Sequence, residues 1–112
     1  MATFFKNAIT KNVGTTPTLV ANTASNSRAT VIGLSLTNLS LGAIQVSVEV
    51  GIPHSPSELK GYYCKDILVP PNTSLRLVNG GEKLILGNSN NLYVSCNTID
   101  GLDVLVSYVE II

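Results

Sequence analysis

The stretch IQVSVEV at residues 44–50 alternates strictly between apolar and polar side chains. Such a period of two is typical of a strand with one buried face. A second stretch, TVIGLSLTN at residues 30–38, has the same period, with Ile32, Leu34 and Leu36 as its apolar side. A short Asn-Leu-Ser-Leu-Gly turn separates the two stretches, so we predict that they pair as an antiparallel hairpin.

Further strand-like segments lie on both sides of this pair. They are expected at residues 3–10, 15–21, 60–69, 73–78, 83–86, 92–97 and 102–111. Pro17 has no backbone N–H to donate, so the second segment should lie at a sheet edge or begin near the proline. Residues 11–14 read as a turn. Asn79-Gly80-Gly81 between two apolar runs indicates a tight hairpin.

Turn signals recur about every 8–12 residues and no segment has a helical period, a pattern typical of a β-sandwich. We therefore predict an all-β, single-domain antiparallel β-sandwich of jelly-roll or Ig-like type, with about eight or nine short strands. The domain covers residues 1–112, and residues 1–12 form an N-terminal arm or an edge strand.

The composition favours the same fold class. Ser, Thr and Asn number 32 against 14 charged residues, and the formal net charge is zero. Thr, Val and Ile suit a pleated sheet, while Asn and Gly suit turns. The low charge argues against a phosphate-binding surface, which needs clustered Lys and Arg. A net charge near zero also favours association between protein molecules.

Two groups of apolar residues are candidates for contact with other subunits. In the segment at residues 102–111, Leu105, Val109 and Ile111 fall on the face opposite the core-facing residues. We therefore expect that strand to be central, or these three side chains to be covered by a partner. Phe4 and Phe5 near the N-terminus are interpreted as anchors, inserted either into the domain's own core or into a neighbour.

No combination of residues points to catalysis. His54, the single histidine, lies in a Pro-rich loop beside Ser55 and Ser57, without the surrounding pattern of a nucleophile. The seven acidic residues nominate no catalytic carboxylate pair. We therefore predict that the protein is not an enzyme and has no catalytic or cofactor-binding residues.

Metal and phosphate sites are not expected either. Asp100 and Asp103 could approach a calcium ion, but Asp100-Gly101 also reads as a plain turn. The glycines at residues 80 and 81 lack the spacing and the Lys-Ser/Thr ending of a phosphate loop. Cys64 and Cys96 are too far apart in sequence for a zinc pattern and are expected to be reduced, unbridged thiols.

The N-terminus lacks the basic stretch and long apolar core of a signal peptide. We therefore expect synthesis in a cytoplasm, with the mature chain starting at Met1 or Ala2. No stretch approaches the length of an apolar membrane span. Neither nucleic acid nor a membrane is expected as a partner.

Four stretches together carry a resemblance to a known class of protein. They are ATVIGLSLTN at residues 29–38, YCKDILVPPNTSL at 63–75, GGEKL at 80–84 and VLVSYVEI at 104–111. In this order they resemble small virion structural proteins of tailed bacteriophages, particularly those of cyanobacteria and marine bacteria. The resemblance spans the chain and consists of strand and turn signatures without catalytic motifs.

The resemblance implies a non-enzymatic subunit of a tailed-phage virion that acts by oligomeric packing. We expect it to decorate or cement the capsid, with a neck, tail or baseplate component as the alternative. The implied partners are other virion proteins and further copies of the chain, with Phe4, Phe5, Leu105, Val109 and Ile111 as the interface. The chain would be made in the host cytoplasm and reside in the virion.

A function of another class stays open, namely a lectin-like β-sandwich that binds carbohydrate. It would use exposed tyrosines together with the loops at residues 54–58 and 88–91. Tyrosine rings provide flat surfaces on which sugars or bases can stack. Two tyrosines exposed on one face would favour this alternative.

Overall fold

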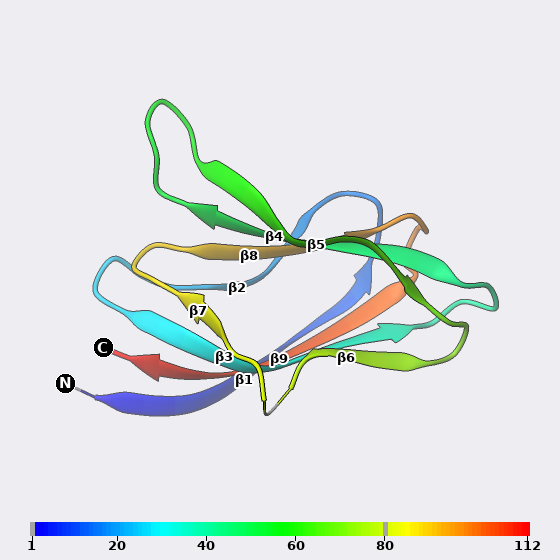
Figure 1. Cartoon of the computed structure of the whole chain (residues 1–112), viewed down its shortest axis with the longest axis horizontal. Helices are drawn as coiled ribbons and strands as arrows, with labels where there is room; N and C mark the ends of the chain where they lie inside the picture. The colour runs from blue at the N-terminus through cyan, green and yellow to red at the C-terminus, as the bar shows by residue number, and fades with distance from the viewer. Residues whose placement is uncertain (1, 80) are drawn as a thin grey trace.

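A computed structural model describes residues 2–79 and 81–112 of the chain. These residues form nine strands and no helix (Figure 1). The strands are β1 (Thr3–Val13), β2 (Thr18–Asn22), β3 (Arg28–Asn38), β4 (Ile44–Ile52), β5 (Leu59–Val69), β6 (Ser74–Val78), β7 (Leu84–Leu86), β8 (Asn91–Cys96) and β9 (Leu102–Ile111). In this part of the chain there is accordingly no helix of the length and hydrophobicity needed to cross a membrane.

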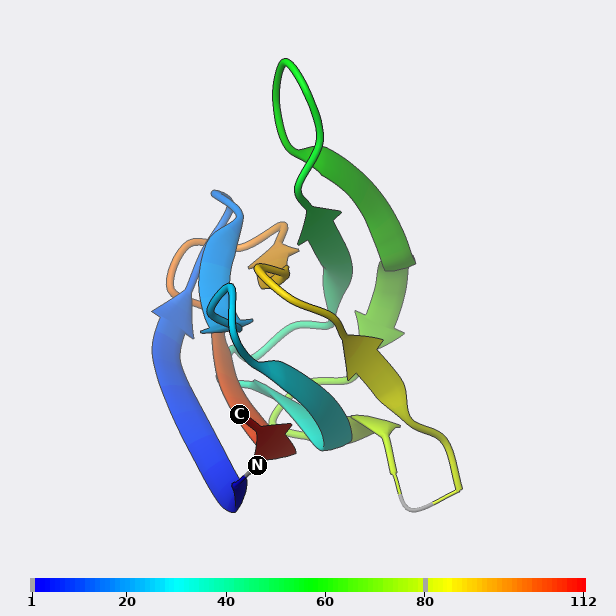
Figure 2. The same ribbon diagram turned by 90° about the vertical axis from the view of Figure 1, so that its left-hand side faces the viewer.

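The strands form two antiparallel sheets packed face to face, which confirms the predicted β-sandwich (Figures 1 and 2). The five-stranded sheet has the order β1-β9-β3-β6, with β7 also pairing with β3. The four-stranded sheet has the order β2-β8-β4-β5. If β6 and β7 are taken as one interrupted strand, the chain crosses between the sheets at nearly every connection. This is the double Greek-key order of a jelly roll.

The core lies between the two sheets and consists almost entirely of Val, Leu and Ile. Every other residue of β4, β8 and β9 faces inward, as the period of two predicts. The largest fully buried side chains include Leu34, Leu36, Ile44, Leu92 and Leu102. At about 25 cal/mol per Å² of buried apolar surface, this layer is the main source of the stability of the sandwich.

The predicted hairpin between β3 and β4 is wrong. Strand β3 lies in the five-stranded sheet and β4 in the four-stranded sheet, and residues 39–43 carry the chain from one sheet to the other. Asn38, at the end of β3, is buried and holds this crossing in place. Its amide nitrogen donates to the carbonyl oxygens of Gly42, Val69 and Pro70 at 2.9, 3.0 and 3.1 Å, and its oxygen accepts the backbone N–H of Ser40. A period of two says which residues face inward, but not whether the next strand lies beside or across the core.

The predicted hairpin at Asn79-Gly80-Gly81 is also wrong, and Gly80 itself lies outside the described residues. β6 pairs with the second half of β3 and β7 pairs with its first half, so neither strand pairs with the other. The two strands run in the same direction along one edge, and that edge is interrupted between Val78 and Leu84.

Two predictions about short segments were wrong. Ile32 was expected to face the core, but a bulge between Val31 and Gly33 places Val31 in the core and leaves Ile32 37% exposed. The extra residue of a bulge shifts the inward and outward positions that follow. The turn expected at residues 11–14 is mostly strand, because β1 continues to Val13 through a register shift. Asn12 within that shift has a φ of 56°.

Candidate functional site

Strand β9 is the central feature of the five-stranded sheet. It lies between β1 and β3, as expected for a strand with apolar residues on both faces. Leu105, Val109 and Ile111 point away from the core, on the outer face of this sheet. Leu105 is 41% exposed, and Val109 and Ile111 are half-buried by their neighbours on the same face.

Strand β1 adds two more apolar side chains to the same face. Phe5 lies directly opposite Val109, and Ile9 lies directly opposite Leu105. Phe5 is 82% exposed and Ile9 is 70% exposed. Neither phenylalanine enters the buried core, so anchoring into the domain's own core is wrong. Phe4 alternates to the other side of the sheet, where its ring centroid lies 5.5 Å from the ammonium nitrogen of Lys6.

Two isoleucines extend this surface across β3 to β7. Ile32 lines the same hollow as Phe5, Asn7 and Ser107. Ile85 lies opposite Thr30 and lines a second hollow with Ile111. We call the set consisting of Phe5, Ile9, Ile32, Ile85, Leu105, Val109 and Ile111 the apolar face.

Sequence reasoning found four members of the apolar face and missed three. Phe5, Leu105, Val109 and Ile111 were candidates, and the structure brings all four together. Ile9 could have been found, because it stands four residues from Phe5 and therefore on the same side of a strand. Ile32 could not, because the bulge that exposes it leaves no sequence signal. Asn7 and Ser107 lie between the Phe5–Val109 and Ile9–Leu105 pairs of this face. A large group of exposed apolar side chains on one face of a single chain points to a contact site.

An ion pair joins β1 to β9 on the side of the sheet opposite the apolar face. The Lys6 ammonium donates to Glu110 Oε1 at 2.7 Å. This hydrogen bond from Lys6 to the nearby carboxylate raises the pKa of Lys6 above its usual value. Lys6 is therefore engaged within its own subunit and points away from the apolar face.

The outer face of the four-stranded sheet carries a cluster of polar side chains. The Glu58 carboxylate accepts hydrogen bonds from Asn91 Nδ2 at 2.6 Å and from the Tyr93 hydroxyl at 2.8 Å. The Lys60 ammonium lies 4.5 Å from the centroid of the Tyr93 ring. Glycine at position 51 leaves room for this arrangement, since a Cβ there would clash with the Glu58 carboxylate. We call Glu58, Lys60, Asn91 and Tyr93 the Glu58 cluster.

The Glu58 cluster gives a pH-dependent prediction. The hydrogen bond from Asn91, and then that from Tyr93, lowers the pKa of Glu58 below 4.5. The charged form therefore adds stability that is present above pH 4.5 and is lost as the pH falls through the lower pKa of the folded state. We expect thermal unfolding of the parent protein to lose more stability between pH 5 and 3 than that of Glu58→Gln. Equal slopes for the parent and Glu58→Gln would contradict the assignment.

Two tyrosines share the outer face of the four-stranded sheet. Tyr62 and Tyr93 both lie opposite Glu49, one on each neighbouring strand, and Tyr62 is 54% exposed. Lysine ammonium groups lie near both rings, that of Lys65 5.7 Å from the Tyr62 centroid. The loops proposed for sugar binding also meet here, because Asn91 donates to Glu58.

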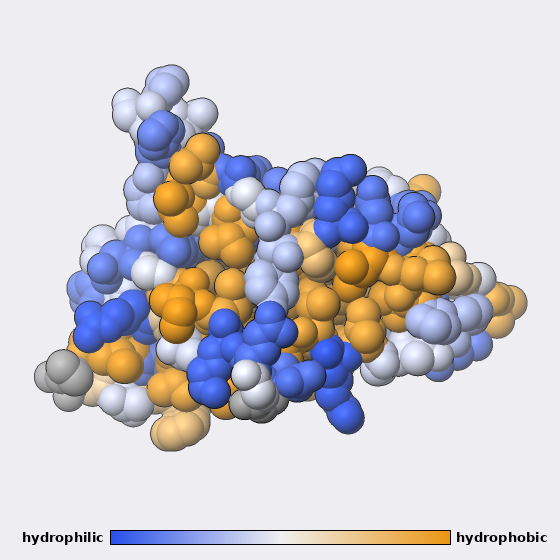
Figure 3. Space-filling model, in the orientation of Figure 1, coloured by the Kyte–Doolittle hydropathy of each residue, from blue (hydrophilic) through white to orange (hydrophobic). Residues whose placement is uncertain are grey.

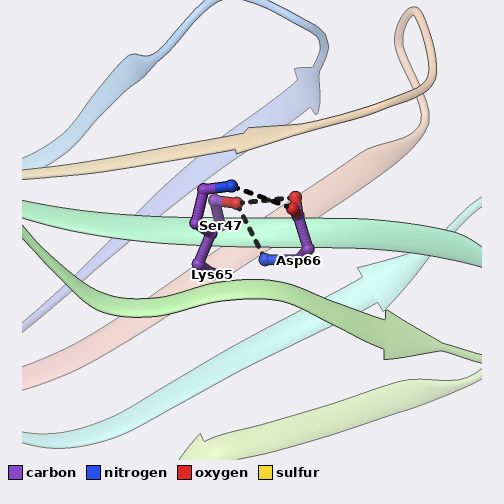
Figure 4. Close-up of polar contacts among 3 residues, drawn as sticks. All are labelled: Ser47, Lys65 and Asp66. Carbon is purple, nitrogen blue, oxygen red and sulfur yellow. Dashed lines mark hydrogen bonds and ion pairs between the residues drawn. The ribbon is translucent and has the colours of Figure 1, made fainter.

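Strand β5, one of the two edges of the four-stranded sheet, is interrupted next to this face. Lys65 and Asp66 together oppose the single residue Ser47, which is a β-bulge (Figure 4). Asp66 has a φ of 52°, its backbone N–H donates to Ser47 Oγ at 3.0 Å, and its carboxylate pairs with Lys65 at 3.2 Å. At the bulge, a backbone N–H of the edge strand is therefore bonded to a side chain of the same sheet.

The structure does not assemble the residues that were examined for catalysis or metal binding into a site. His54, Ser55 and Ser57 are exposed in the loop between β4 and β5. Asp103 accepts the backbone N–H of Asn12 at 3.0 Å, so it supports the end of β1. In residues 2–79 and 81–112, no three His, Cys, Asp or Glu side chains lie close enough to hold a metal ion. Cys64 and Cys96 are free thiols, and burial raises the pKa of Cys64.

A shallow hollow of about 540 Å³ lies where the β4–β5 hairpin projects beyond the sandwich. Its lining is apolar and aromatic apart from Lys60, and it includes Val50, Leu59, Tyr63 and Leu84. Figure 3 shows hydrophobic surface along this side, between the hairpin and the strands below it. The Tyr63 hydroxyl at its margin donates to Glu82 at 2.9 Å. A lining of this kind supplies contact surface and no reactive group.

Comparisons with protein-family models, with curated proteins and with solved structures found no match for this chain. Its function is therefore argued from its own surfaces. The feature that stands out among the described residues is the apolar face of the five-stranded sheet.

Proposed function

We propose that the protein is a non-enzymatic structural subunit of a tailed-phage virion and that it works by docking the apolar face onto neighbouring virion proteins. Capsid decoration or cementing is the role we favour, ahead of a neck, tail or baseplate position. The proposal is carried by one observation, the seven apolar side chains gathered on the outside of a sheet whose other side already packs against the core.

The removal of water from such a face lowers the free energy. Each Å² of apolar surface that becomes buried contributes about 25 cal/mol. A stable contact buries about 800 Å² on each partner, and the apolar face spans the four positions β1, β9, β3 and β7 of one sheet. Because the face is presented by paired strands, it is rigid before contact and loses little conformational freedom on docking.

Two further observations support the proposal. Four stretches of the sequence resemble small virion proteins of tailed phages, as described above. The jelly-roll order of the strands is common in viral capsid proteins, although lectins and cupins use it too. A fold of this kind hosts several functions, so the apolar face carries more weight than the topology.

Incorporation into virus particles tests the proposal. In cells infected with the parent phage, the chain should co-purify with particles at a fixed copy number, measured by quantitative mass spectrometry. Leu105→Asp places a charge in the middle of the apolar face and should reduce incorporation at least tenfold. Leu68→Asp is the control, because it places the same charge at an exposed leucine on the other sheet (Leu68 is 62% exposed and Leu105 is 41% exposed), and this variant should be incorporated normally. Absence of the parent chain from purified particles, or equal incorporation of both variants, would overturn the proposal.

A second candidate, carbohydrate binding, is favoured by Tyr62 and Tyr93 on one face beside Glu58 and Asn91. Carboxylate and amide groups can hydrogen-bond to sugar hydroxyls while a ring packs against the sugar. A glycan array probed with the parent chain tests this. Binding that is lost in Tyr62→Ala and kept in Leu105→Asp would support it, and an array without signal would remove it.

A further inference from the structure

The free edge of β1 can be read residue by residue. Ala2 and Ile112 exchange two backbone hydrogen bonds of 2.9 Å, so they form a hydrogen-bonded pair of the β1–β9 ladder. The register then continues without a shift from Thr3 opposite Ile111 to Thr10 opposite Val104. Because hydrogen-bonded and non-hydrogen-bonded pairs alternate in an antiparallel ladder, the backbone N–H and C=O groups of Thr3, Phe5, Asn7 and Ile9 point away from β9.

The other three edges of the sandwich are interrupted. β2 follows Pro17, has five residues and contains a register shift. β5 contains two register shifts, one of them the bulge at Asp66. The third edge is divided between β6 and β7. Natural proteins block the pairing of edge strands with bulges, prolines, charges and short strands.

Edge strand β1 lacks these devices between Thr3 and Thr10. The ladder there has no bulge, and the segment contains no proline. Its single charged residue, Lys6, is paired with Glu110 on the inner side of the sheet. The segment therefore has the form of a strand that is ready to pair with another chain (Figure 2 shows it at the margin of the sandwich).

We propose that β1 pairs antiparallel with β1 of a second copy of this chain, about a two-fold axis that passes through Asn7. The two five-stranded sheets then become one continuous sheet. Each hydrogen-bonded residue pair exchanges two N–H···O bonds across the axis. This pairing uses the edge of the sheet and stands independently of the virion role proposed above, which uses its outer face.

The register follows from the side chains. With the axis at Asn7, Phe5 of each copy lies opposite Ile9 of the other, and Asn7 lies opposite Asn7. Aromatic and β-branched residues are favourable cross-strand pairs. These two side chains are also the most exposed members of the apolar face. An axis at Lys6 would place two lysines opposite each other, and an axis at Ala8 would place Phe5 opposite Lys11 and Ile9 opposite Asn7.

A second copy fits this edge better than an unrelated strand for two reasons. The segment from Thr3 to Lys11 is self-complementary in the Asn7 register, and the net charge of zero gives two copies no overall repulsion. The pairing also places the apolar faces of both copies side by side on one surface.

Light scattering of the purified chain tests the proposal directly. At about 100 μM we expect twice the chain mass of 11.8 kDa for the parent protein and for Asn7→Ala. Asn7→Pro removes an N–H that points away from β9, so it blocks the new pairing and leaves the β1–β9 bonds intact. This variant should be a monomer of 11.8 kDa. A monomeric parent, or an Asn7→Pro protein as dimeric as Asn7→Ala, would overturn the proposal.

Disulfide cross-linking provides a second test that does not depend on proline. In a hydrogen-bonded pair the two Cα atoms are about 5.5 Å apart, which suits a disulfide. Asn7→Cys, in a chain that also carries Cys64→Ala, should form a covalent dimer under mild oxidation. Thr3→Cys is the control, because the two copies of Thr3 would lie about 27 Å apart, given a rise of about 3.4 Å per residue. Cross-linking at Thr3 or Ala8 in place of Asn7 would overturn the proposed axis. Particle incorporation of a monomeric parent would leave the virion role standing while removing the dimer.

Discussion

Replacing Asn38 by alanine is expected to lower the free energy of unfolding by about 3 kcal/mol. Its amide nitrogen donates to three carbonyl oxygens from two different connections, those of Gly42, Val69 and Pro70. The side chain is buried, so water cannot take over these contacts without opening the structure. A buried polar group left without a partner typically costs about 1–3 kcal/mol, and here several groups lose their partner together.

Thermal denaturation measures this effect, which corresponds to a fall in Tm of about 10–15 °C for a domain of this size. Ser40→Ala is the matched control. It removes the hydroxyl that donates to Asn38 Oδ1 and leaves all three donor contacts of Asn38 in place. We expect Ser40→Ala to lose less than about 1 kcal/mol, the usual net value of one hydrogen bond. An Asn38→Ala protein within 0.5 kcal/mol of the parent, a threshold of about the scatter for surface changes, would show that Asn38 does not hold the crossing.

Replacing Leu36 by alanine should cost about 3 kcal/mol as well, for a different reason. Leu36 is fully buried and lies between Val104 of β9 and Leu75 of β6 in the register of the five-stranded sheet. Truncation removes buried apolar atoms and leaves a cavity that a rigid sheet cannot fill by collapse. Substitutions of this kind cost about 2–5 kcal/mol.

Leu105→Ala is the control for Leu36→Ala, because it truncates the same residue type on the other face of the same sheet. Leu105 is already 41% exposed, so less apolar surface returns to water and no closed cavity forms. We expect a loss below about 1 kcal/mol at low protein concentration. Urea unfolding of both variants gives the comparison, and equal losses would contradict the assignment of the two faces.

The positions of the strands could be predicted from the sequence, but their neighbours could not. The alternating residues of β4, β8 and β9 mark their inward faces, and the bounds of β9 agree with the expected segment. The predicted hairpins failed because a period of two is the same whether a chain turns back within a sheet or crosses to the other sheet. Buried Asn38 decides this at the end of β3, and its partners at Val69 and Pro70 lie 31 and 32 residues further along the chain.

The residues of the candidate site could likewise be predicted only in part. Leu105, Val109 and Ile111 were found because they stand on the second face of one strand. Ile32 was placed on the wrong face, because one inserted residue in β3 reverses the pattern at that point. The Glu58 cluster joins residues 33 and 35 positions apart, and no local pattern predicts such a meeting.

The place of β9 also determines when the protein can fold during its synthesis. β1 pairs within the chain with β9, and β9 is formed by residues 102–111, which are synthesised long after β1. Strand β1 therefore stays unpaired on both sides until residues 102–111 have left the ribosome. The five-stranded sheet can accordingly close only after that point, and chains that pause before residue 102 expose β1 to aggregation with other nascent copies. The strand that we propose to join finished subunits is thus also the one that must be shielded until β9 is available.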